Sequence, residues 1–359
     1  MFGDVEGILG SVEDLGEDRV RDLIASKLEK DPKEVLGYGD DAVAFKIDRE
    51  QLLVVHTDVL VGKTDILPGM SAFDVGRKAV VMNVSDVISK GAEPLSLVFS
   101  WGIPRTYDSV LVSEIAEGMN KAAKEIGIAV SGGDTSESDE FFLSGTAFGL
   151  VHKDTILKRS TVKTGDILAS TGPFGLTSAA YRILLEGAGV SQNARERILD
   201  SAYRPKMRIA ETRALMRKGL VHAGIDSSDG LARSLHWLGR RSHVGFVVDN
   251  LPVTEDVTQF ALMNKLDYVD LALYEGGEEY ELIFAMTPEN WPKALDAVEE
   301  VGGKLYRIGV ATVDPTIVLS LRNLWNKQIE DRGWQHFGKW GRSDRKVPPA
   351  ETAARKRPT

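Results

Sequence analysis

Cysteine is absent from all 359 residues of the chain. Its absence excludes disulfide bonds, thiolate metal sites, iron–sulfur clusters and cysteine nucleophiles. Long apolar runs are missing too: no segment approaches the ~18 consecutive apolar residues that cross a bilayer, and the first residues are acidic where a secretory signal is basic. These absences predict a cytoplasmic protein with no membrane partner.

Positive charge is in short supply. The chain carries 44 Lys and Arg against 53 Asp and Glu, which gives a formal net charge of −9. Affinity for a nucleic acid backbone comes from clustered Lys and Arg, so this balance argues against a nucleic acid partner. The excess of acidic side chains is instead available to hold cations.

Several common catalytic signatures are missing as well. The sequence has no Gly-x-Ser-x-Gly elbow and no His-Glu-x-x-His pair. Gly62, Lys63 and Thr64 imitate the end of a P-loop, but Thr57 stands where that motif requires glycine. The six histidines are scattered, so we expect no catalytic residue that acts as a covalent nucleophile.

The length suggests two domains at roughly 100–200 residues each. We expect an N-terminal domain over 1–151, a C-terminal domain over 152–338 and a disordered basic tail over 339–359. Strands and helices alternate in both halves, which predicts an α+β chain built from two α/β domains. The expected strands are 52–57, 96–101, 128–130, 141–150, 166–171, 223–226 and 281–286. The expected helices are 17–29, 71–91, 109–126, 210–217 and 291–301, with two more starting at Leu176 and Leu231.

Acidic residues gather at predicted strand ends and in glycine-rich turns. Six clusters of this kind occur, at 39–41, 56–58, 65, 83–86, 132–135 and 225–230. Mg²⁺ is held by a few carboxylates with phosphate oxygens and water, so the clusters together favour a Mg–nucleotide site. Any one cluster alone is more typical of turn or capping chemistry. Asp86 differs, because a carboxylate on a mostly apolar helix is costly unless it is paired or metal-bound.

Two glycine-rich segments, 131–135 and 171–175, are candidates for phosphate binding at helix N-termini, where backbone N–H groups bind anions. A site made of carboxylates, Mg²⁺ and backbone amides suits phosphoryl transfer, which needs mainly positioning and charge neutralisation. We therefore expect four carboxylates to converge on one cleft, those of Asp41, Asp58, Asp86 and Asp134.

Taken in order, these motifs resemble thiamine-monophosphate kinase. That family belongs to the ATP-binding superfamily of aminoimidazole ribonucleotide synthetase, selenophosphate synthetase and the hydrogenase maturation protein HypE. The resemblance spans about residues 15–337 and rests on GDDAV (39–43), HTDVLV (56–61), RKAVVMNVSDVISKGAEPL (77–95), SGGDTS (131–136), KTGDILASTGPFG (163–175), RP (204–205), IDSSDGL (225–231), GGEEYEL (276–282) and GWQHF (333–337). The last two motifs point to the kinase branch.

The resemblance implies a two-domain synthetase-superfamily fold, a homodimer paired through the N-terminal sheets, and ATP bound between the domains over several Mg²⁺ ions. By motif position it assigns metal contacts to Asp41, His56, Thr57, Asp58, Asp86, Asp134, Asp226 and Asp229. It assigns ATP contacts to Gly133, Asp134, Arg159 and Ser228, and substrate contacts to Asp65, Glu278 and Trp334. The implied reaction is direct in-line transfer of the ATP γ-phosphoryl group to thiamine monophosphate, which gives thiamine diphosphate.

Two positions depart from the family pattern. Bacterial-type members usually carry a His-Phe pair in the loop where this chain reads Lys63-Thr64-Asp65, so a substrate contact by Asp65 would use different chemistry. Glu279 stands where Asp is common, and its extra methylene moves the charge by about a bond length. Glu279 is therefore left out of the predicted site.

The absence of cysteine also separates the relatives. Selenophosphate synthetase resembles a Cys- or selenocysteine-dependent enzyme and HypE needs a C-terminal Cys, so neither chemistry is possible here. Two alternatives stay open: a ligase similar to aminoimidazole ribonucleotide synthetase, and a non-catalytic regulator that binds Mg–nucleotide. The complete acid clusters favour catalysis, because a binder could lose carboxylates whose mutual repulsion is costly without metal.

Overall fold

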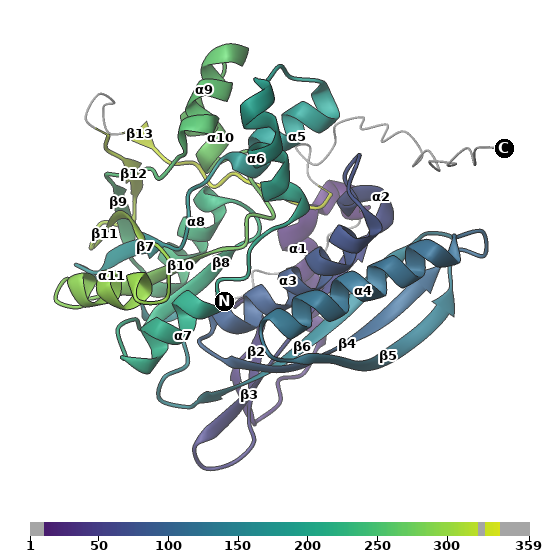
Figure 1. Cartoon of the computed structure of the whole chain (residues 1–359). Coiled ribbons are helices and arrows are strands. Elements are labelled where there is room, and N and C mark those ends of the chain that lie inside the picture. Colours follow the sequence, from purple (N-terminus) through teal and green to yellow (C-terminus); the bar gives the residue numbers. More distant parts are fainter. Residues whose placement is uncertain (1–10, 322–326, 338–359) are drawn as a thin grey trace.

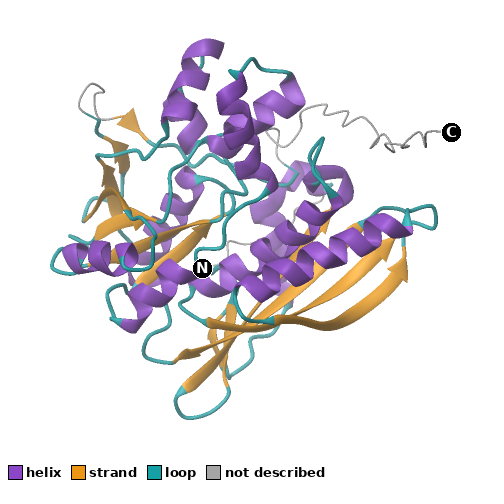
Figure 2. Cartoon of the chain, in the orientation of Figure 1, coloured by secondary structure: helices purple, strands orange, loops and turns teal. Residues whose placement is uncertain are grey.

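The computed structural model describes residues 11–321 and 327–337, which form two β-sheets with helices packed against them (Figures 1 and 2). The first sheet is built from residues 34–152 and the second from residues 167–328. Strands and helices are mixed in both halves, which confirms the predicted α+β class. The predicted disordered tail over 339–359 lies outside the described residues. Within 11–321 and 327–337, no helix has the length and apolar content needed to span a membrane.

Six strands form the first sheet in the order β1-β2-β3-β6-β4-β5. β3 and β6 pair antiparallel along their whole lengths, β4 pairs antiparallel with β6, and β5 lies parallel to β4 at the edge. Buried and half-buried side chains alternate along β6, so one face of the sheet is covered and the other is more open. The strands are β1 (Glu34–Leu36), β2 (Val43–Lys46), β3 (Gln51–Val61), β4 (Glu93–Ile103), β5 (Ala129–Glu137) and β6 (Phe142–His152).

Two helices, α3 (Ala72–Ser89) and α4 (Ser109–Glu125), cover one face of the first sheet (Figure 1). The Ser71 hydroxyl accepts a hydrogen bond from the Asp74 backbone N–H at 3.1 Å, which confirms Ser71 as the N-cap of α3. Gly91, with φ +72°, follows the helix in the left-handed conformation that commonly ends one.

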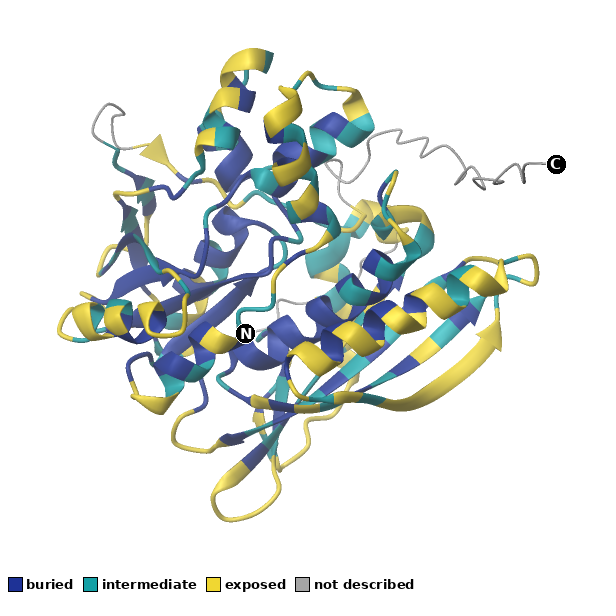
Figure 3. Ribbon diagram, viewed as in Figure 1, coloured by how far each residue is buried: buried dark blue, intermediate teal, exposed yellow. Residues whose placement is uncertain are grey.

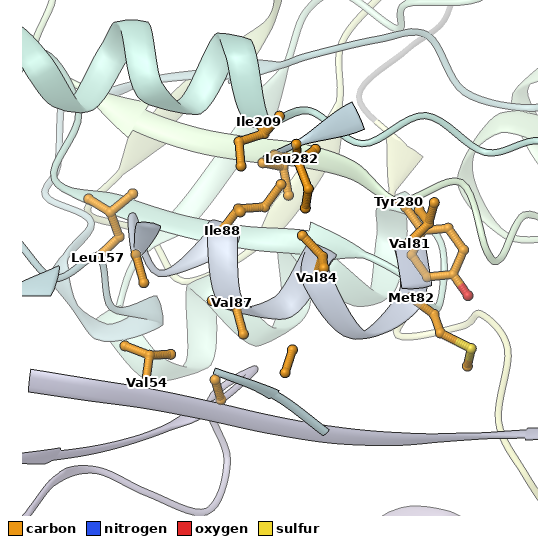
Figure 4. Packing of buried hydrophobic residues seen from close by; sticks show 14 of the residues in the cluster. Val54, Val81, Met82, Val84, Val87, Ile88, Leu157, Ile209, Tyr280 and Leu282 are labelled. Atoms are coloured by element: carbon orange, nitrogen blue, oxygen red, sulfur yellow. The ribbon is translucent and has the colours of Figure 1, made fainter. Parts of the chain in front are cut away.

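Helix α3 is buried on almost every side, with 15 of its 18 residues inaccessible. It contacts β3 and β6 of the first sheet and also β8, β10 and α7 of the second half. Figure 4 shows Val84 and Val87 of α3 between Val54 of β3 and Leu282 of β10, all in one apolar cluster. The helix therefore joins the two halves of the chain and places most of its polar groups in the interior, with Arg77, which pairs with Glu125 of α4, as an exception.

Seven strands form the second sheet in the order β13-β12-β9-β11-β7-β10-β8. Its pairs are antiparallel except β12 with β9, and both β8 and β10 are buried along their whole lengths (Figure 3). The strands are β7 (Ile167–Ser170), β8 (Ala223–Ser227), β9 (Gly245–Val248), β10 (Glu281–Met286), β11 (Tyr306–Thr312), β12 (Ile317–Leu319) and β13 (Lys327–Gln328). The helices are α5 (Leu176–Glu186), α6 (Gln192–Tyr203), α7 (Ile209–Arg217), α8 (Leu231–Ser242), α9 (Glu255–Asn264), α10 (Tyr268–Leu273) and α11 (Trp291–Glu299).

Two sequence-based predictions need correction. Residues 131–135 do not form a loop at a helix N-terminus, because β5 runs on through them as an edge strand parallel to β4. Glycine is needed there for close packing: a Cβ atom on Gly133 would lie 1.7 Å from the Phe99 carbonyl oxygen of β4. The N-terminal helix α1 (Val12–Lys27) starts earlier than the predicted residue 17 and is interrupted at Gly16, where φ is +72°.

Helices α3 and α4 touch through their backbones at two glycines. A Cβ atom on Gly118 would lie 1.9 Å from the Phe73 carbonyl oxygen, and one on Gly76 would lie 1.9 Å from the Ile115 carbonyl oxygen. These helices can approach so closely only where no side chain stands between them.

We expect Gly118→Ala to lower the free energy of unfolding by about 1–3 kcal/mol, because the added methyl group forces the helices apart. This sign is opposite to the gain of about 1 kcal/mol that alanine brings inside an unconstrained helix. Denaturant titration measures the change, and Ser113→Ala on the exposed side of α4 is the control. A Gly118→Ala variant as stable as the parent would contradict the close packing.

Candidate active site

A cleft of about 570 Å³ is lined by residues from both halves of the chain. The first half contributes β3, α2 (Gly62–Asp65), α3 and the segment before β2, and the second half contributes the loop after β8 and the segments 275–280 and 334–336. The predicted site residues that line this cleft are Asp41, His56, Thr57, Asp58, Asp65, Asp86, Arg159, Ser228, Asp229, Glu278 and Trp334. Residues from almost the whole length of the chain thus meet in one place.

An acidic cluster at this cleft draws on several elements. His56 and Asp58 lie on the same face of β3 because side chains alternate along a strand, and Asp86 comes from α3. The ligand atoms of these three side chains lie within 4.8 Å of one another. The carboxylate oxygens of Asp41, Asp86 and Asp226 meet the same limit. Asp86 belongs to both groups, so its carboxylate lies at the centre of the cluster.

Two carboxyl groups of the cluster are hard to ionise. Burial raises the pKa of Asp86 well above its ordinary value, and the negative charge of Asp226 raises it further. Burial together with the charge of Asp41 raises the pKa of Asp226 to about 8. A carboxylate in this position is stabilised by a bound cation, which removes both the repulsion and the cost of burial.

His56 shows that the cluster fits a divalent cation. Its Nδ1 lies 2.6 Å from the Asp41 carbonyl oxygen and donates to it, which leaves Nε2 unprotonated. That Nε2 is buried, lies 3.2 Å from Asp86 Oδ2 and has no hydrogen-bond partner among the described residues. Burial lowers the pKa of His56, which keeps the ring neutral. A neutral imidazole nitrogen beside carboxylate oxygens is a suitable donor set for a divalent metal.

Asp41 has a different environment from the other acids. Its Oδ1 accepts a hydrogen bond from Arg159 Nε at 2.9 Å and a second one from the same guanidinium. Its Oδ2 accepts from Ser89 Oγ at 2.9 Å and contacts the Lys90 ammonium. Burial favours the neutral acid, but the charges of Arg159 and Lys90 outweigh burial and lower the pKa of Asp41. Asp41 is therefore ionised and paired with protein cations.

Three further predicted residues have local partners. The Thr57 hydroxyl donates to the Gly145 carbonyl oxygen of β6 at 2.7 Å and is not part of the acidic cluster. The Ser228 carbonyl accepts from the Glu278 N–H at 2.7 Å, and the Asp229 carbonyl accepts from the Trp334 N–H at 3.0 Å. The loop after β8 thus holds the two predicted substrate residues by their backbones.

Gly133 and Asp134 lie away from this cleft in the single chain. Both belong to β5, which is separated from β3 by β6 and β4. Neither lines the cleft. The predicted convergence therefore holds for Asp41, Asp58 and Asp86, but within one chain it is wrong for Asp134.

The predicted substrate end of the cleft is organised around Glu278. Lys78 Nζ lies 2.5 Å from Glu278 Oε1 and donates to the Asp65 carbonyl oxygen at 2.9 Å. The Tyr181 hydroxyl donates to Glu278 Oε2 at 2.6 Å. Trp334 lines the same cleft. The Glu278 carboxylate is thus held in a fixed orientation by a buried ammonium and a phenol.

Lys78, Lys90 and Tyr181 were not predicted from the sequence. The sequence does indicate that both lysines need a partner of opposite charge. Each lies on or beside the apolar run of α3, where a buried charge must be paired. Tyr181 carried no such signal, since a tyrosine on an amphipathic helix is ordinary.

Comparison with known proteins identifies the family. Residues 39–151 match AIR synthase related protein, N-terminal domain, and residues 163–322 match AIR synthase related protein, C-terminal domain. The thiamine-monophosphate kinase of Nitrosopumilus maritimus is 32% identical over 298 residues, covering 83% of this chain and 93% of the relative. That of Pyrococcus horikoshii is 36% identical over 254 residues, covering 70% and 78%. The chain belongs to the thiamine-monophosphate kinase family.

The fold of the family is confirmed by a solved structure. The structure described as AaThiL complexed with AMPPCP and TMP has a TM-score of 0.79 and 25% identity, covering 92% of this chain and 100% of that chain. HypE structures at about 20% identity share the fold. The predicted synthetase-superfamily architecture is therefore correct.

The segment 171–175, the second candidate for phosphate binding, contacts carboxylates of the chain itself. The Gly175 N–H at the start of α5 donates to Glu279 Oε1 at 2.6 Å. A Cβ atom on Gly172 would lie 2.3 Å from the Glu281 carboxylate. No residue of this loop lines the cleft. The prediction that it binds phosphate is thus not supported, because carboxylates of the chain itself fill that place.

Glu279 should make stability depend on pH. Burial raises its pKa from 4.5 to about 8, and its Oε2 has no hydrogen-bond partner among the described residues. Between these two pH values the folded chain keeps the proton while the unfolded chain loses it. Stability therefore falls as pH rises through this window, by at most about 1.4 kcal/mol per pH unit.

We expect Glu279→Gln to remove this loss, so its stability relative to the parent rises between about pH 5 and about pH 8.5. Urea unfolding at both pH values, with a chelator present, measures the difference. Glu299→Gln on the exposed side of α11 is the control and should show no such trend. A parallel pH dependence in Glu279→Gln and the parent would show that Glu279 ionises normally.

Proposed function

We propose that the chain transfers a phosphoryl group from ATP to thiamine monophosphate and so forms thiamine diphosphate. The observation that carries this proposal is that the acidic cluster and the Glu278–Trp334 end share one cleft. Transfer between two phosphate-bearing substrates needs both bound together, with charge neutralised where their phosphates meet. The shared fold with AaThiL, solved with AMPPCP and TMP, supports the same assignment.

His56, Asp58, Asp86 and Asp226 would hold several Mg²⁺ ions, which neutralise the phosphoryl oxygens of ATP. We assign Arg159 and Ser228 to ATP, since both line the cleft close to this cluster. The Arg159 guanidinium donates to Asp41 and its backbone N–H donates to Asp40, so the residue is held in place before the nucleotide arrives. Fixed positive charge of this kind stabilises the charge that develops on the transferred group.

Glu278, Trp334 and Asp65 would bind thiamine monophosphate. The indole of Trp334 offers a flat face for a cationic ring, and Glu278 can accept from an amino group or balance the positive charge. Lys78 and Tyr181 keep the Glu278 carboxylate in position for this contact. The acceptor phosphate would then face the acidic cluster.

The transfer is proposed to be direct. The chain has no cysteine. Two histidines line the cleft: His56, which is tied to Asp41 and faces Asp86, and His336, whose ring packs edge-on to Trp334. We assign neither of them as a carrier of the phosphoryl group, so both substrates must bind before either product leaves. Sequential kinetics are the consequence.

One assay separates this proposal from its alternatives. The purified chain is incubated with Mg–ATP and either thiamine monophosphate or formylglycinamidine ribonucleotide, and mass spectrometry identifies which compound changes. Thiamine diphosphate formation supports the kinase. Conversion of the ribonucleotide supports a ligase similar to aminoimidazole ribonucleotide synthetase, and nucleotide binding without any product supports a regulator.

We also propose that the protein is a cytoplasmic homodimer paired through its first sheet, with domains 1–151 and 152–338. The β5 strand is exposed along most of its length at the sheet edge, as Figure 3 shows, and Val59 and Leu95 of the same sheet are 45% and 48% exposed. Unpaired edge strands are templates for association. In such a dimer Gly133 and Asp134 would contribute to the cleft of the second copy, since both lie apart from the cleft of their own chain.

We expect Asp86→Asn to reduce turnover by two or more orders of magnitude while the fold is kept, because charge neutralisation is the main catalytic device in phosphoryl transfer. Steady-state kinetics with saturating Mg–ATP measure the loss, and circular dichroism checks the fold. Asp296→Asn on the exposed side of α11 is the control. An active Asp86→Asn enzyme would remove Asp86 from the proposed metal site.

Trp334→Ala should raise the Michaelis constant for thiamine monophosphate about 2- to 30-fold and leave that for ATP almost unchanged. The reason is that stacking on a cationic ring is worth about 0.5–2 kcal/mol and concerns only one substrate. Trp291→Ala, at the start of α11, controls for the loss of a tryptophan. Equal losses for both substrates with a lower melting temperature would show that Trp334 only packs the end of the chain.

A further inference from the structure

Lys90 is a fixed positive charge beside the acidic cluster. It follows the last residue of α3, and its side chain is completely buried. The ammonium lies 2.5 Å from Asp40 Oδ1, contacts Asp41 Oδ2 and donates to the Gly224 carbonyl oxygen at 2.9 Å. Three oxygen atoms from two segments thus surround the ammonium, in an arrangement similar to that of ligands around a metal ion.

The partners of Asp41 leave it little capacity to bind a metal. A carboxylate oxygen accepts about two hydrogen bonds. Arg159 supplies two to Oδ1, while Ser89 and Lys90 supply one each to Oδ2. A divalent ion at Asp41 would have to displace one of these partners. It would also lie a few ångströms from two fixed cations, where repulsion in a buried site is strong.

The remaining members of the cluster are in the opposite situation. Among the described residues, no lysine or arginine forms an ion pair with Asp86 or Asp226, and His56 Nε2 has no hydrogen-bond partner. The cluster is therefore divided into a side that protein cations already neutralise and a side that they do not.

We propose that Lys90 is a built-in cation of this site, which takes the place of a divalent ion at Asp40 and Asp41. Divalent ions bind instead at His56, Asp58, Asp86 and Asp226. This inference rests on the proposed function, because it takes the open side of the cluster to be the Mg²⁺ site of the kinase. It adds a positioning role for a residue that touches neither substrate.

The test removes the ammonium and counts bound ions. Lys90→Met keeps a side chain of similar length but leaves Asp40 and Asp41 without Lys90. The full chain is titrated with Mn²⁺, with and without a non-hydrolysable ATP analogue, and electron paramagnetic resonance measures the free ion. We expect Lys90→Met to bind a further Mn²⁺ ion that the parent does not bind, or to bind Mn²⁺ about tenfold more tightly, because a unit positive charge has been removed nearby.

Thermal stability gives an independent readout. In a chelator, Lys90→Met should melt well below the parent, because buried carboxylates have lost their partner. Millimolar Mg²⁺ should raise the melting temperature of Lys90→Met more than that of the parent, because an ion that binds only the folded chain stabilises it. Lys78→Met is the matched control: Lys78 is equally buried on α3 but pairs with Glu278. It should lose stability without selective rescue by Mg²⁺ and bind the parental number of Mn²⁺ ions.

The outcomes separate the two proposals. If the parent binds no Mn²⁺ even with nucleotide, both the metal-dependent function and the role of Lys90 are wrong. If the parent binds Mn²⁺ and Lys90→Met binds the same number with the same affinity, only the role of Lys90 is overturned. A Lys90→Met chain that stays unfolded in Mg²⁺ also overturns it, since the ammonium is then not replaceable by a divalent ion.

Discussion

The burial of helix α3 between the two sheets is the constraint on which the rest of the structure depends. Fifteen of its 18 residues are inaccessible, yet the helix and its end carry Lys78, Asp86 and Lys90. A charge in such a place costs several kcal/mol unless an opposite charge lies within contact distance. The chain meets this requirement for both lysines by placing carboxylates against them. Among the described residues no lysine or arginine pairs with Asp86, so ionising this carboxyl group is costly unless a cation binds there.

The charged residues along α3 make the two ends of the cleft chemically different. Lys78 and Lys90 are separated by twelve positions, about 18 Å along a helix, with Asp86 between them but nearer Lys90. At one end Lys78 holds Glu278, which is exposed to the cleft and suited to a cationic ring. Near the other end the acidic cluster suits polyphosphate with its cations. A single helix thus fixes the separation between the acidic cluster and the Glu278 end, so the alignment of these two regions does not depend on a loop.

Much of this arrangement could be predicted from the sequence, and the failures have physical causes. The α3 boundaries follow from Ser71 and Gly91, and Asp86 is conspicuous on an apolar helix. Residues 131–135 were misassigned because glycine favours turns locally, whereas here Gly133 permits close parallel pairing with β4. The loop 171–175 was misassigned because its anion is Glu279, more than a hundred positions away. The role of Lys90 could not be predicted because its partners Asp40 and Asp41 lie about fifty positions earlier in the sequence, which no local pattern contains.

The acidic cluster lowers the stability of the folded chain. Burial and the repulsion of neighbouring carboxylates raise the pKa of both Asp86 and Asp226, so ionising the two groups together is a cost to the folded chain. In the proposed function a bound metal–nucleotide would relieve that cost, which would make the same acids a source of binding energy for ATP. Without Lys90 and Arg159, Asp41 would add a third unmatched charge to the cluster. The protein cations therefore limit the repulsion to what the fold can sustain before substrate arrives, and leave the rest to drive binding.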